Sequence, residues 1–227
     1  MIDIHTHILP QFDDGAQSVD EAIELVAEIK SQGAENVVLS SHFYTDRESV
    51  KTFCERYAVA YDNFAQNFDI KPLKGAEVAV GNNFFHLPTP KELLIEGTEY
   101  MLIELPFCSK MQDWVYGGIA KMLRDGVIPI VAHVELYPYF SVKTVEKLKK
   151  SGALIQVNAS SLFVPREKKK IFKLFCKDYI DFLATDTHNN TTRRPRLKDA
   201  LTVLTKKFGN EKVNDFIAKT EGLMIEL

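Results

Sequence analysis

The chain has 227 residues, of which 45% are hydrophobic, enough for one sizeable core in a single α/β domain. Its 28 Lys and Arg against 31 Asp and Glu leave a net charge of −3, which gives no reason to expect nucleic-acid binding or adhesion to membranes. No basic or long apolar segment opens the chain, so no signal peptide is expected, and no apolar run approaches the roughly 20 residues of a membrane span. Three scattered cysteines, Cys54, Cys108 and Cys176, predict free thiols in a cytoplasmic protein.

Strand-like and helix-like stretches alternate along the chain. A short strand is predicted at residues 2–5, and a capping box at Ser18-Val19-Asp20-Glu21 opens a helix that Gly33 ends. Further strands are predicted at residues 36–40, within 71–80, and at 100–105, 127–132, 153–158 and 180–185. Further helices are predicted at about 47–67, 112–125, 142–150, 165–177, 196–208 and 211–219. Seven βα-type units in one run favour a parallel sheet closed into a TIM-like barrel.

The histidines follow the predicted strands. Of the six, only His86 does not sit at or just past the C-terminal end of a strand; the others are His5, His7, His42, His133 and His188. Barrel active sites are built from that rim. Alternate residues of a strand point the same way, so both imidazoles of the opening H-x-H can face one point. Glu77 and Glu104 stand in or beside apolar strands, where a carboxylate is costly unless a cation compensates it. The pattern predicts a metal site.

Each of these residues also has an ordinary explanation when it is taken alone. His133 could be a hydrogen-bonded core histidine, Glu104 could pair with an arginine, and Asp13-Asp14-Gly15 could be only a turn. These explanations would all have to hold at once, at the same rim. The metal site is therefore the favoured reading.

Several motifs resemble those of the polymerase-and-histidinol-phosphatase (PHP) superfamily. They are the opening Met-Ile-Asp-Ile-His-Thr-His-Ile-Leu-Pro, Asp13-Asp14-Gly15, Ser40-Ser41-His42, Gly75-Ala76-Glu77, Leu102-Ile103-Glu104-Leu105-Pro106, Ala132-His133 and Thr185-Asp186-Thr187-His188-Asn189. More narrowly, the chain resembles the bacterial PHP-type tyrosine-protein phosphatases of capsule and exopolysaccharide synthesis, the CpsB/CapC/YwqE type. The H-x-H-I-L-P and D-D-G opening is specific to that subgroup, and the resemblance covers essentially the whole chain.

The resemblance implies one distorted (β/α)7 barrel of the PHP type over residues 1–227, holding three divalent metals. Manganese is the first choice, with iron or zinc as alternatives, because imidazole and carboxylate ligands suit all three. Carried over by position, the ligand sets are His5, His7, Glu77 and Asp186 for the first metal; Asp14, His42 and His188 for the second; and Glu77, Glu104 and His133 for the third.

The implied activity is hydrolysis of phosphotyrosine, on a bacterial tyrosine kinase that regulates polysaccharide synthesis. Metals lower the pKa of bound water, so that hydroxide can attack phosphorus in line, with Glu104, His42 and Asp186 as the catalytic set. A phenol, with a pKa of about 10, leaves with little acid assistance, which favours phosphotyrosine over phosphoserine. The alternative cysteine-dependent route needs a Cys-x5-Arg loop, and the segment at Cys108 lacks that arginine.

The match departs from the subgroup at the phosphate contacts. After the fifth strand the family reads His-Pro-Glu-Arg, whereas this chain has His133-Val134-Glu135-Leu136, and a leucine cannot give an arginine's bidentate hydrogen bonds. Arg193 and Arg194 are candidate substrate-binding residues, and the sequence does not say which of them contacts phosphate. Six aromatic residues near the predicted rim could stack on a substrate ring: Phe43, Tyr44, Trp114, Tyr137, Tyr139 and Phe140.

Two other functions stay open because of the missing arginine. One is a PHP phosphoesterase for a small phosphate monoester, such as a histidinol-phosphate-like compound or a nucleotide. The other is a metal-stabilised protein that engages a kinase without turnover. The sequence leaves the metal, the oligomeric state and the physiological substrate undecided.

Overall fold

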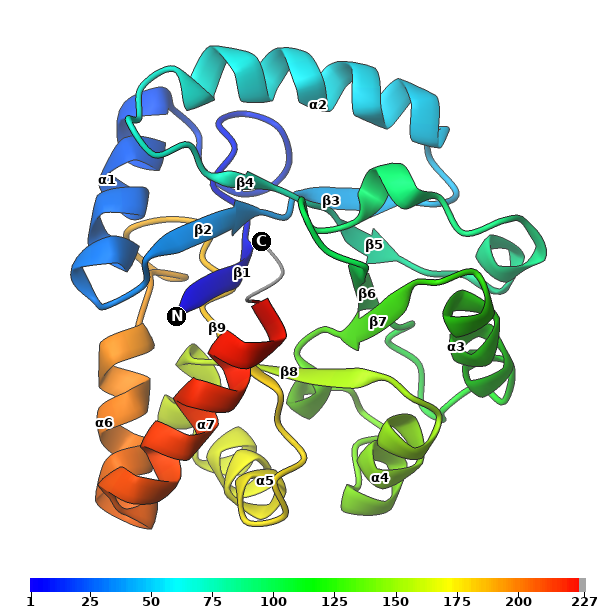
Figure 1. Ribbon diagram of the computed structural model, residues 1–227, viewed down its shortest axis with the longest axis vertical. Helices are drawn as coiled ribbons and strands as arrows, with labels where there is room; N and C mark the ends of the chain where they lie inside the picture. The colour runs from blue at the N-terminus through cyan, green and yellow to red at the C-terminus, as the bar shows by residue number, and fades with distance from the viewer. Residues whose placement is uncertain (225–227) are drawn as a thin grey trace.

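The computed structural model describes residues 1–224 as a ring of parallel strands with helices packed around the outside (Figure 1). The strands are β1 (Ile2–Thr6), β2 (Asn36–Leu39), β3 (His42–Tyr44), β4 (Leu73–Lys74), β5 (Glu77–Ala79), β6 (Tyr100–Glu104), β7 (Ile128–Val131), β8 (Leu154–Asn158) and β9 (Phe182–Ala184). The α-helices are α1 (Val19–Ser31), α2 (Val50–Ala65), α3 (Trp114–Arg124), α4 (Val142–Lys150), α5 (Pro165–Phe175), α6 (Leu197–Phe208) and α7 (Asn210–Met224). Short 3-10 helices are η1 (Asn82–His86), η2 (Lys91–Leu93), η3 (Val134–Leu136) and η4 (Ser160–Phe163).

Each of the seven predicted strand regions contains a strand, and the structure adds one strand, β3, that was not predicted. The region predicted at 36–40 covers β2 alone, and β3 follows after Ser40 and Ser41; the region 71–80 contains β4 and β5, separated by Gly75 and Ala76. The ladder pairs Leu39 with Lys74 before the gap and His42 with Glu77 after it, so the register is the same on both sides. At the gap the Glu77 N–H donates to both Ser40 O and Ser41 O at 3.1 Å. The interruption thus lies directly before two predicted ligands.

The predicted closed barrel is not confirmed. The strands described form one sheet in the order β1-β2-β4 and another in the order β3-β5-β6-β7-β8-β9. Between β1 and β9 there is only an isolated bridge from Thr6 to Thr187, flanked by two backbone hydrogen bonds of 2.8 Å. A side chain replaces the ladder here, because the Asp3 carboxylate accepts the Thr185 N–H at 3.0 Å and the Thr185 hydroxyl at 2.6 Å.

Two apolar clusters hold the fold together. The larger lies between the strands and the surrounding helices. The smaller fills the space inside the strands with side chains such as Ile4, Val38, Leu102 and Ile130, and Met224 of α7 joins it. α7 lies in front of β8 and β9 in Figure 1, so this last helix covers the interior at the end away from the ligand-bearing strand ends. Burial of this kind contributes about 25 cal/mol per Å² of apolar surface.

The predicted helix signals are largely reproduced. Ser18 caps α1 by accepting the Glu21 N–H at 3.1 Å, but the Glu21 carboxylate accepts from Gln17 N–H instead of from Ser18 as a full capping box requires. The predicted helix at 142–150 coincides with α4, and the last helix runs on to Met224, beyond its predicted end at 219. None of the helices described combines the length and the apolarity that crossing a bilayer requires.

Candidate metal centre

The nine predicted ligands meet at one rim of the parallel strands, where His42 and Glu77 follow the ends of β2 and β4 after a gap of two residues. His5 lies in β1, His42 begins β3, Glu77 begins β5 and Glu104 ends β6. The others come from the segments that follow strands: His7 and Asp14 after β1, His133 after β7, and Asp186 and His188 after β9. His86, the histidine that the prediction set apart, lies in η1 and outside this cluster. The parallel pairing explains the gathering, since it brings all C-terminal strand ends to one rim.

The two histidines of the opening motif face each other at the centre of the cluster. His5 Nε2 and His7 Nε2 are 3.1 Å apart, and Glu77 oxygens lie 3.4 and 3.3 Å from them. Asp186 Oδ1 lies 3.5 Å from the first nitrogen and 3.6 Å from the second. Three members of the predicted first ligand set, His5, His7 and Glu77, are therefore in mutual contact, and the fourth, Asp186, contacts both histidines.

The other two predicted sets flank this one. Asp14 Oδ1 is 3.5 Å from His42 Nε2 and 3.4 Å from His188 Nε2. On the other side of Glu77, the imidazole of His133 lies 2.9 Å from Glu77 Oε1 and 3.5 Å from Glu104 Oε1. His42 Nδ1 is 2.9 Å from Glu77 Oε2, so Glu77 touches histidines of all three sets. That these side chains bind metal remains a prediction.

The donor set fits divalent cations on two observations. Ligands at about 2.1 Å from one cation stand about 3.0–3.4 Å from their nearest neighbours, and the spacings among His5, His7 and Glu77 are 3.1, 3.3 and 3.4 Å. The second observation is His188, which is 1% exposed. Its Nδ1–H donates to Asp186 O at 3.0 Å, which leaves a buried Nε2 without a hydrogen-bond partner. A cation would satisfy that lone pair.

A layer of polar residues orients the predicted ligands, and the sequence reading missed it. Asp13 accepts from His7 Nδ1–H at 2.9 Å and from the His42 N–H at 3.0 Å. Gln156 Oε1 accepts from His5 Nδ1–H at 3.2 Å, and Asn158 Nδ2 donates to Asp186 at 2.7 Å. The sequence did carry a signal for the latter pair, because Gln156 and Asn158 stand two apart in an apolar strand and so share a face.

Backbone geometry at the rim is unusual at two predicted ligands. His133 has φ 29° and Asp186 has φ 51°, a left-handed conformation that is costly for residues other than glycine. Each directly follows the end of a strand region, where the bend turns its side chain toward the centre. Gly15 has a different constraint, because a Cβ there would lie 1.6 Å from His7 O. The turn at Asp13-Asp14-Gly15 thus needs glycine to approach the first strand.

Two buried carboxyl groups at the centre, Glu77 and Asp186, have lowered pKa values. Burial alone would raise the pKa of Glu77, but the charge of His5 and the hydrogen bonds of His133 and His42 hold it well below its usual range. Burial also opposes ionisation of Asp186, yet the charges of His5 and His7 lower its pKa. Both carboxyl groups are therefore ionised although they are buried. A concentration of buried negative charge of this kind is what a divalent cation compensates.

The pKa values of three buried histidines are shifted in opposite directions. Burial would lower the pKa of His7, but hydrogen bonds to Asp13 and Glu77 raise it well above its ordinary value. Burial would likewise lower the pKa of His133, and the hydrogen bond and charge of Glu77 outweigh this and raise it to about 9. For His188, burial and then the charge of His7 lower the pKa to about 4. Binding of a cation to imidazole nitrogen would compete with protons at the first two residues and not at the third.

The two candidate substrate arginines lie in different surroundings. Arg193 donates from one terminal nitrogen to both Asp186 oxygens at 2.9 Å, and its other terminal nitrogen is 3.7 Å from Asp14. Arg194 points into a neighbouring groove together with Leu136. The structure therefore brings Arg193, and not Arg194, against the predicted ligands.

Of the aromatic candidates, only one contacts a predicted ligand from an accessible position. Phe43 and Tyr137 are buried at 2% and 1% exposure and pack the core. The Tyr44 ring stacks on His42, with centroids 5.1 Å apart. Phe107, which the sequence reading did not consider, is 55% exposed and its ring centroid lies 5.8 Å from that of His133. An exposed aromatic ring beside the centre is a candidate contact for a substrate ring.

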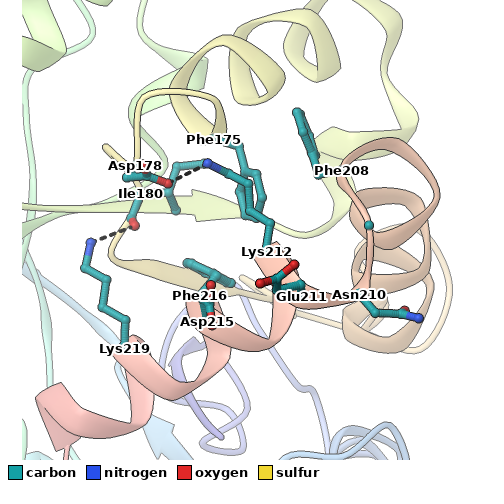
Figure 2. A pocket seen from close by; sticks show the side chains of 11 residues that line it. Phe175, Asp178, Ile180, Phe208, Asn210, Glu211, Lys212, Asp215, Phe216 and Lys219 are labelled. Atoms are coloured by element: carbon teal, nitrogen blue, oxygen red, sulfur yellow. Dashed lines mark hydrogen bonds and ion pairs between the residues drawn. The ribbon is translucent and has the colours of Figure 1, made fainter.

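One cavity, of about 660 Å³, lies between the α5–β9 turn and α7 and contains none of the predicted ligands (Figure 2). Its cations are neutralised, since Lys212 is 2.8 Å from Asp178 and Lys219 is 2.8 Å from Asp181. A second cavity, of about 650 Å³, borders the centre at Asp186 and Arg193.

A parallel α/β fold with a rim of histidines and carboxylates defines a class of metal-dependent hydrolase-like proteins, and sequence comparison narrows it. The family described as "Capsular polysaccharide synthesis, CpsB/CapC" matches residues 1–226. The chain therefore belongs to the CpsB/CapC family, as its motifs indicated.

Curated relatives and a solved structure agree with this assignment. The tyrosine-protein phosphatase CpsB of Streptococcus agalactiae is 26% identical, with 99% of this chain and 98% of that protein covered. The tyrosine-protein phosphatase YwqE of Bacillus subtilis is 31% identical, with 93% and 86% covered. A solved structure described as YwqE from Bacillus subtilis and CpsB from Streptococcus pneumoniae, "unique metal-dependent tyrosine phosphatases", matches with a TM-score of 0.84 at 26% identity, covering 100% of this chain and 95% of that chain.

Proposed function

We propose that this protein is a metal-dependent protein-tyrosine phosphatase that hydrolyses phosphotyrosine on a bacterial tyrosine kinase controlling capsule or exopolysaccharide synthesis. The observation that carries the proposal is the cluster of nine imidazole and carboxylate side chains at one rim, in a chain whose relatives are named tyrosine-protein phosphatases. The solved relative described as metal-dependent supports the same activity.

Three divalent cations are proposed for the centre, with manganese preferred over iron or zinc. The proposed ligand sets are those that the motifs implied. The close clusters His5-His7-Glu77 and His7-Asp14-His42-His188 support the first two sets in large part, whereas Glu77 and Glu104 cluster with His42. His133 supports the third set through its contacts with Glu77 and Glu104. When bound, such cations supply a Lewis acid for phosphoryl oxygens and a source of hydroxide at neutral pH. Glu77 is assigned to more than one cation because it touches His5, His42 and His133.

The chain's own residues bind and orient the phosphate ester. Arg193 is assigned to the phosphate oxygens, because it lies against the predicted ligands and a planar guanidinium can make paired hydrogen bonds with an oxyanion; at Asp186 a single terminal nitrogen now donates to both oxygens. Glu104 and His42, with side chains 19% and 13% exposed, border the open side of the cluster. Burial and then the charge of Glu77 raise the pKa of Glu104, so this carboxylate can accept a proton there. The phenolate leaving group needs little further acid assistance.

The wider setting is also proposed. We assign residues 1–227 to one domain of the PHP type and place the protein in the cytoplasm, where its three free thiols would stay reduced. Its partner would be a phosphotyrosine protein.

An activity assay tests the proposal. Purified protein with added manganese should hydrolyse p-nitrophenyl phosphate and a phosphotyrosine peptide, with at least about tenfold preference over the matching phosphoserine peptide. The Glu104→Gln variant is the control, and hydrolysis no greater than that of the control contradicts the proposal. A panel of phosphorylated metabolites tests the remaining enzymatic alternative, which would be favoured if a small ester were turned over about tenfold better than every phosphotyrosine substrate.

A further inference from the structure

A groove lined by three arginines leads away from the candidate metal centre. We call it the arginine groove; the lining residues that matter are Asp186, Arg193, Arg194, Arg196, Phe163 and Glu167. It is the cavity of about 650 Å³ that lies between η4, the start of α5 and the segment after β9. At one end it reaches Asp186 and Arg193, so a molecule whose phosphate is held at the centre can extend into it.

Arg194 is an unpaired cation in this groove. Its side chain is exposed, and within residues 1–224 no hydrogen bond, ion pair or ring contact involves it. The lysines of the cavity beside α7 differ, because Lys212 is bonded to Asp178 and Lys219 to the Ile180 carbonyl (Figure 2). An arginine without an acceptor, pointing into a groove beside an active centre, is free to bind an anion.

Arg196 is fixed in place but not satisfied. Its guanidinium carbon lies 3.3 Å above the Phe163 ring, which holds the planar group in one orientation. Its Nε is buried and has no hydrogen-bond partner. Among residues 1–224 the one carboxylate in contact with it is that of Asp199, whose Oδ2 lies 3.4 Å from a terminal nitrogen of Arg196 and whose side chain is 60% exposed. A buried donor without an acceptor is unfavourable, so an oxyanion in the groove would complete its bonding.

The remaining charges in the groove do not neutralise these two arginines. Asp186 is bonded to Arg193, and Glu167 is 3.9 Å from Lys170. The arginine groove therefore has a surplus of positive charge that is contributed by Arg194 and Arg196. Positive charge in a recess attracts anions, and guanidinium groups bind carboxylate and phosphate oxygens in pairs.

We propose that Arg194 and Arg196 form a subsite for an anionic side chain that lies next to the phosphotyrosine in the substrate polypeptide. The inference rests on the proposed function, since it requires the phosphate of that tyrosine to be held at Arg193. The anion is a carboxylate or a second phosphate, because both present the oxygen pair that a guanidinium binds. The subsite thus selects phosphotyrosines in acidic or multiply phosphorylated segments.

Peptide selectivity tests the subsite. Four phosphotyrosine peptides should be compared that are identical except at the neighbouring positions, which carry alanine, glutamate, a second phosphotyrosine or lysine. The parent protein should have a kcat/KM for the glutamate or doubly phosphorylated peptide about three- to tenfold above that for the alanine peptide, mainly through KM, with lysine lowest. Which of the two anionic peptides is preferred distinguishes a carboxylate from a phosphate ligand.

The variants are chosen to separate the groove from general charge effects. The quantity to compare is the ratio of kcat/KM for the glutamate peptide to kcat/KM for the alanine peptide. Arg194→Ala and Arg196→Ala should each reduce this ratio, and the double variant should bring it close to one. Thermal unfolding checks that Arg196→Ala is still folded. Arg196→Lys keeps the charge but not the planar fork and should retain part of it. Arg124→Ala, an exposed arginine of α3 outside the groove, is the matched control and should leave the ratio as in the parent.

Two results would overturn the subsite: equal kcat/KM for the alanine and glutamate peptides in the parent, or an equal loss of the ratio in Arg124→Ala. Binding is measured in parallel, by fluorescence anisotropy of the same labelled peptides with Glu104→Gln. If the parent hydrolyses no phosphotyrosine substrate, the proposed function fails. The anisotropy preference for the anionic peptides, and its loss in Arg194→Ala, still decides the subsite independently.

Discussion

The candidate metal centre and the arginine groove adjoin at Asp186, yet they are built differently. His5, His7 and Glu77 are at most 1% exposed and sit in or next to strands whose backbone is hydrogen-bonded on both sides. Arg193 is 44% exposed, and it and Arg194 come from the irregular segment after β9. Strand ends fix a side chain through many contacts, whereas a loop fixes it through few. Chemistry is therefore assigned to the rigid region and substrate choice to the adaptable one.

The largest effect is expected at Glu77. Glu77→Gln keeps the shape but removes the charge that His5, His42 and His133 face. Bound metal, measured by elemental analysis, should fall well below that of the parent, and turnover of p-nitrophenyl phosphate should drop about 10³-fold or more. Glu146→Gln, on the surface of α4, is the control and should change neither quantity. Full metal content and activity in Glu77→Gln would refute the assignment of the centre.

Metal removal should also destabilise the fold. A cation present at about 100 times its dissociation constant stabilises the folded state by about 2.7 kcal/mol, so chelation should lower the free energy of unfolding by that order. Denaturant unfolding with manganese and with a chelator measures this difference. In Glu77→Gln the two curves should nearly coincide. Coincident curves in the parent would mean that no cation binds the folded centre.

A smaller effect is expected at Asp13, which hydrogen-bonds to predicted ligands and is not itself one of them. Asp13 orients His7 and the His42 backbone, and loss of such a partner commonly costs 10- to 100-fold in metal affinity or activity, that is about 1–3 kcal/mol. Asp13→Asn should show this loss in a manganese titration of activity, with activity partly recovered at high metal concentration. Asp20→Asn, in the first turn of α1, serves as the exposed control. An unchanged titration would mean that the support of His7 is dispensable.

The smallest effect is expected at the rim. Phe107→Ala removes an exposed ring 5.8 Å from His133 and should raise KM for p-nitrophenyl phosphate and phosphotyrosine about three- to tenfold, with kcat little changed. Phe107→Tyr should restore KM, and Leu87→Ala, another exposed apolar side chain, should have no effect. A lower kcat with an unchanged KM would contradict a role in binding the substrate ring.

The difference between the two regions also explains what the sequence predicted. The seven strand regions and the gathering of histidines followed from local periodicity and from where parallel strands end. Local sequence patterns could not predict two features of the sheet, because both depend on pairing between distant segments. They are the interruptions at Ser40 and Gly75 and the hydrogen bonds of Asp3 that stand in place of a ladder between β1 and β9. Phe107 and Arg196 were missed because a loop residue acquires its role from neighbours that the chain order does not reveal.

The matched interruption of β2–β3 and β4–β5 has a consequence for engineering this protein. In each of the two segments, β2–β3 and β4–β5, two residues outside the ladder separate the strands. The pairing continues in the same register after this gap, so His42 and Glu77 stay opposite each other. Deleting one residue from either segment would turn the side chain of His42 or Glu77 to the other face of the sheet. Directed evolution should therefore keep the length of both segments and vary the side chains at positions 194 and 196, which could create new peptide preferences while Arg193 stays in place against Asp186.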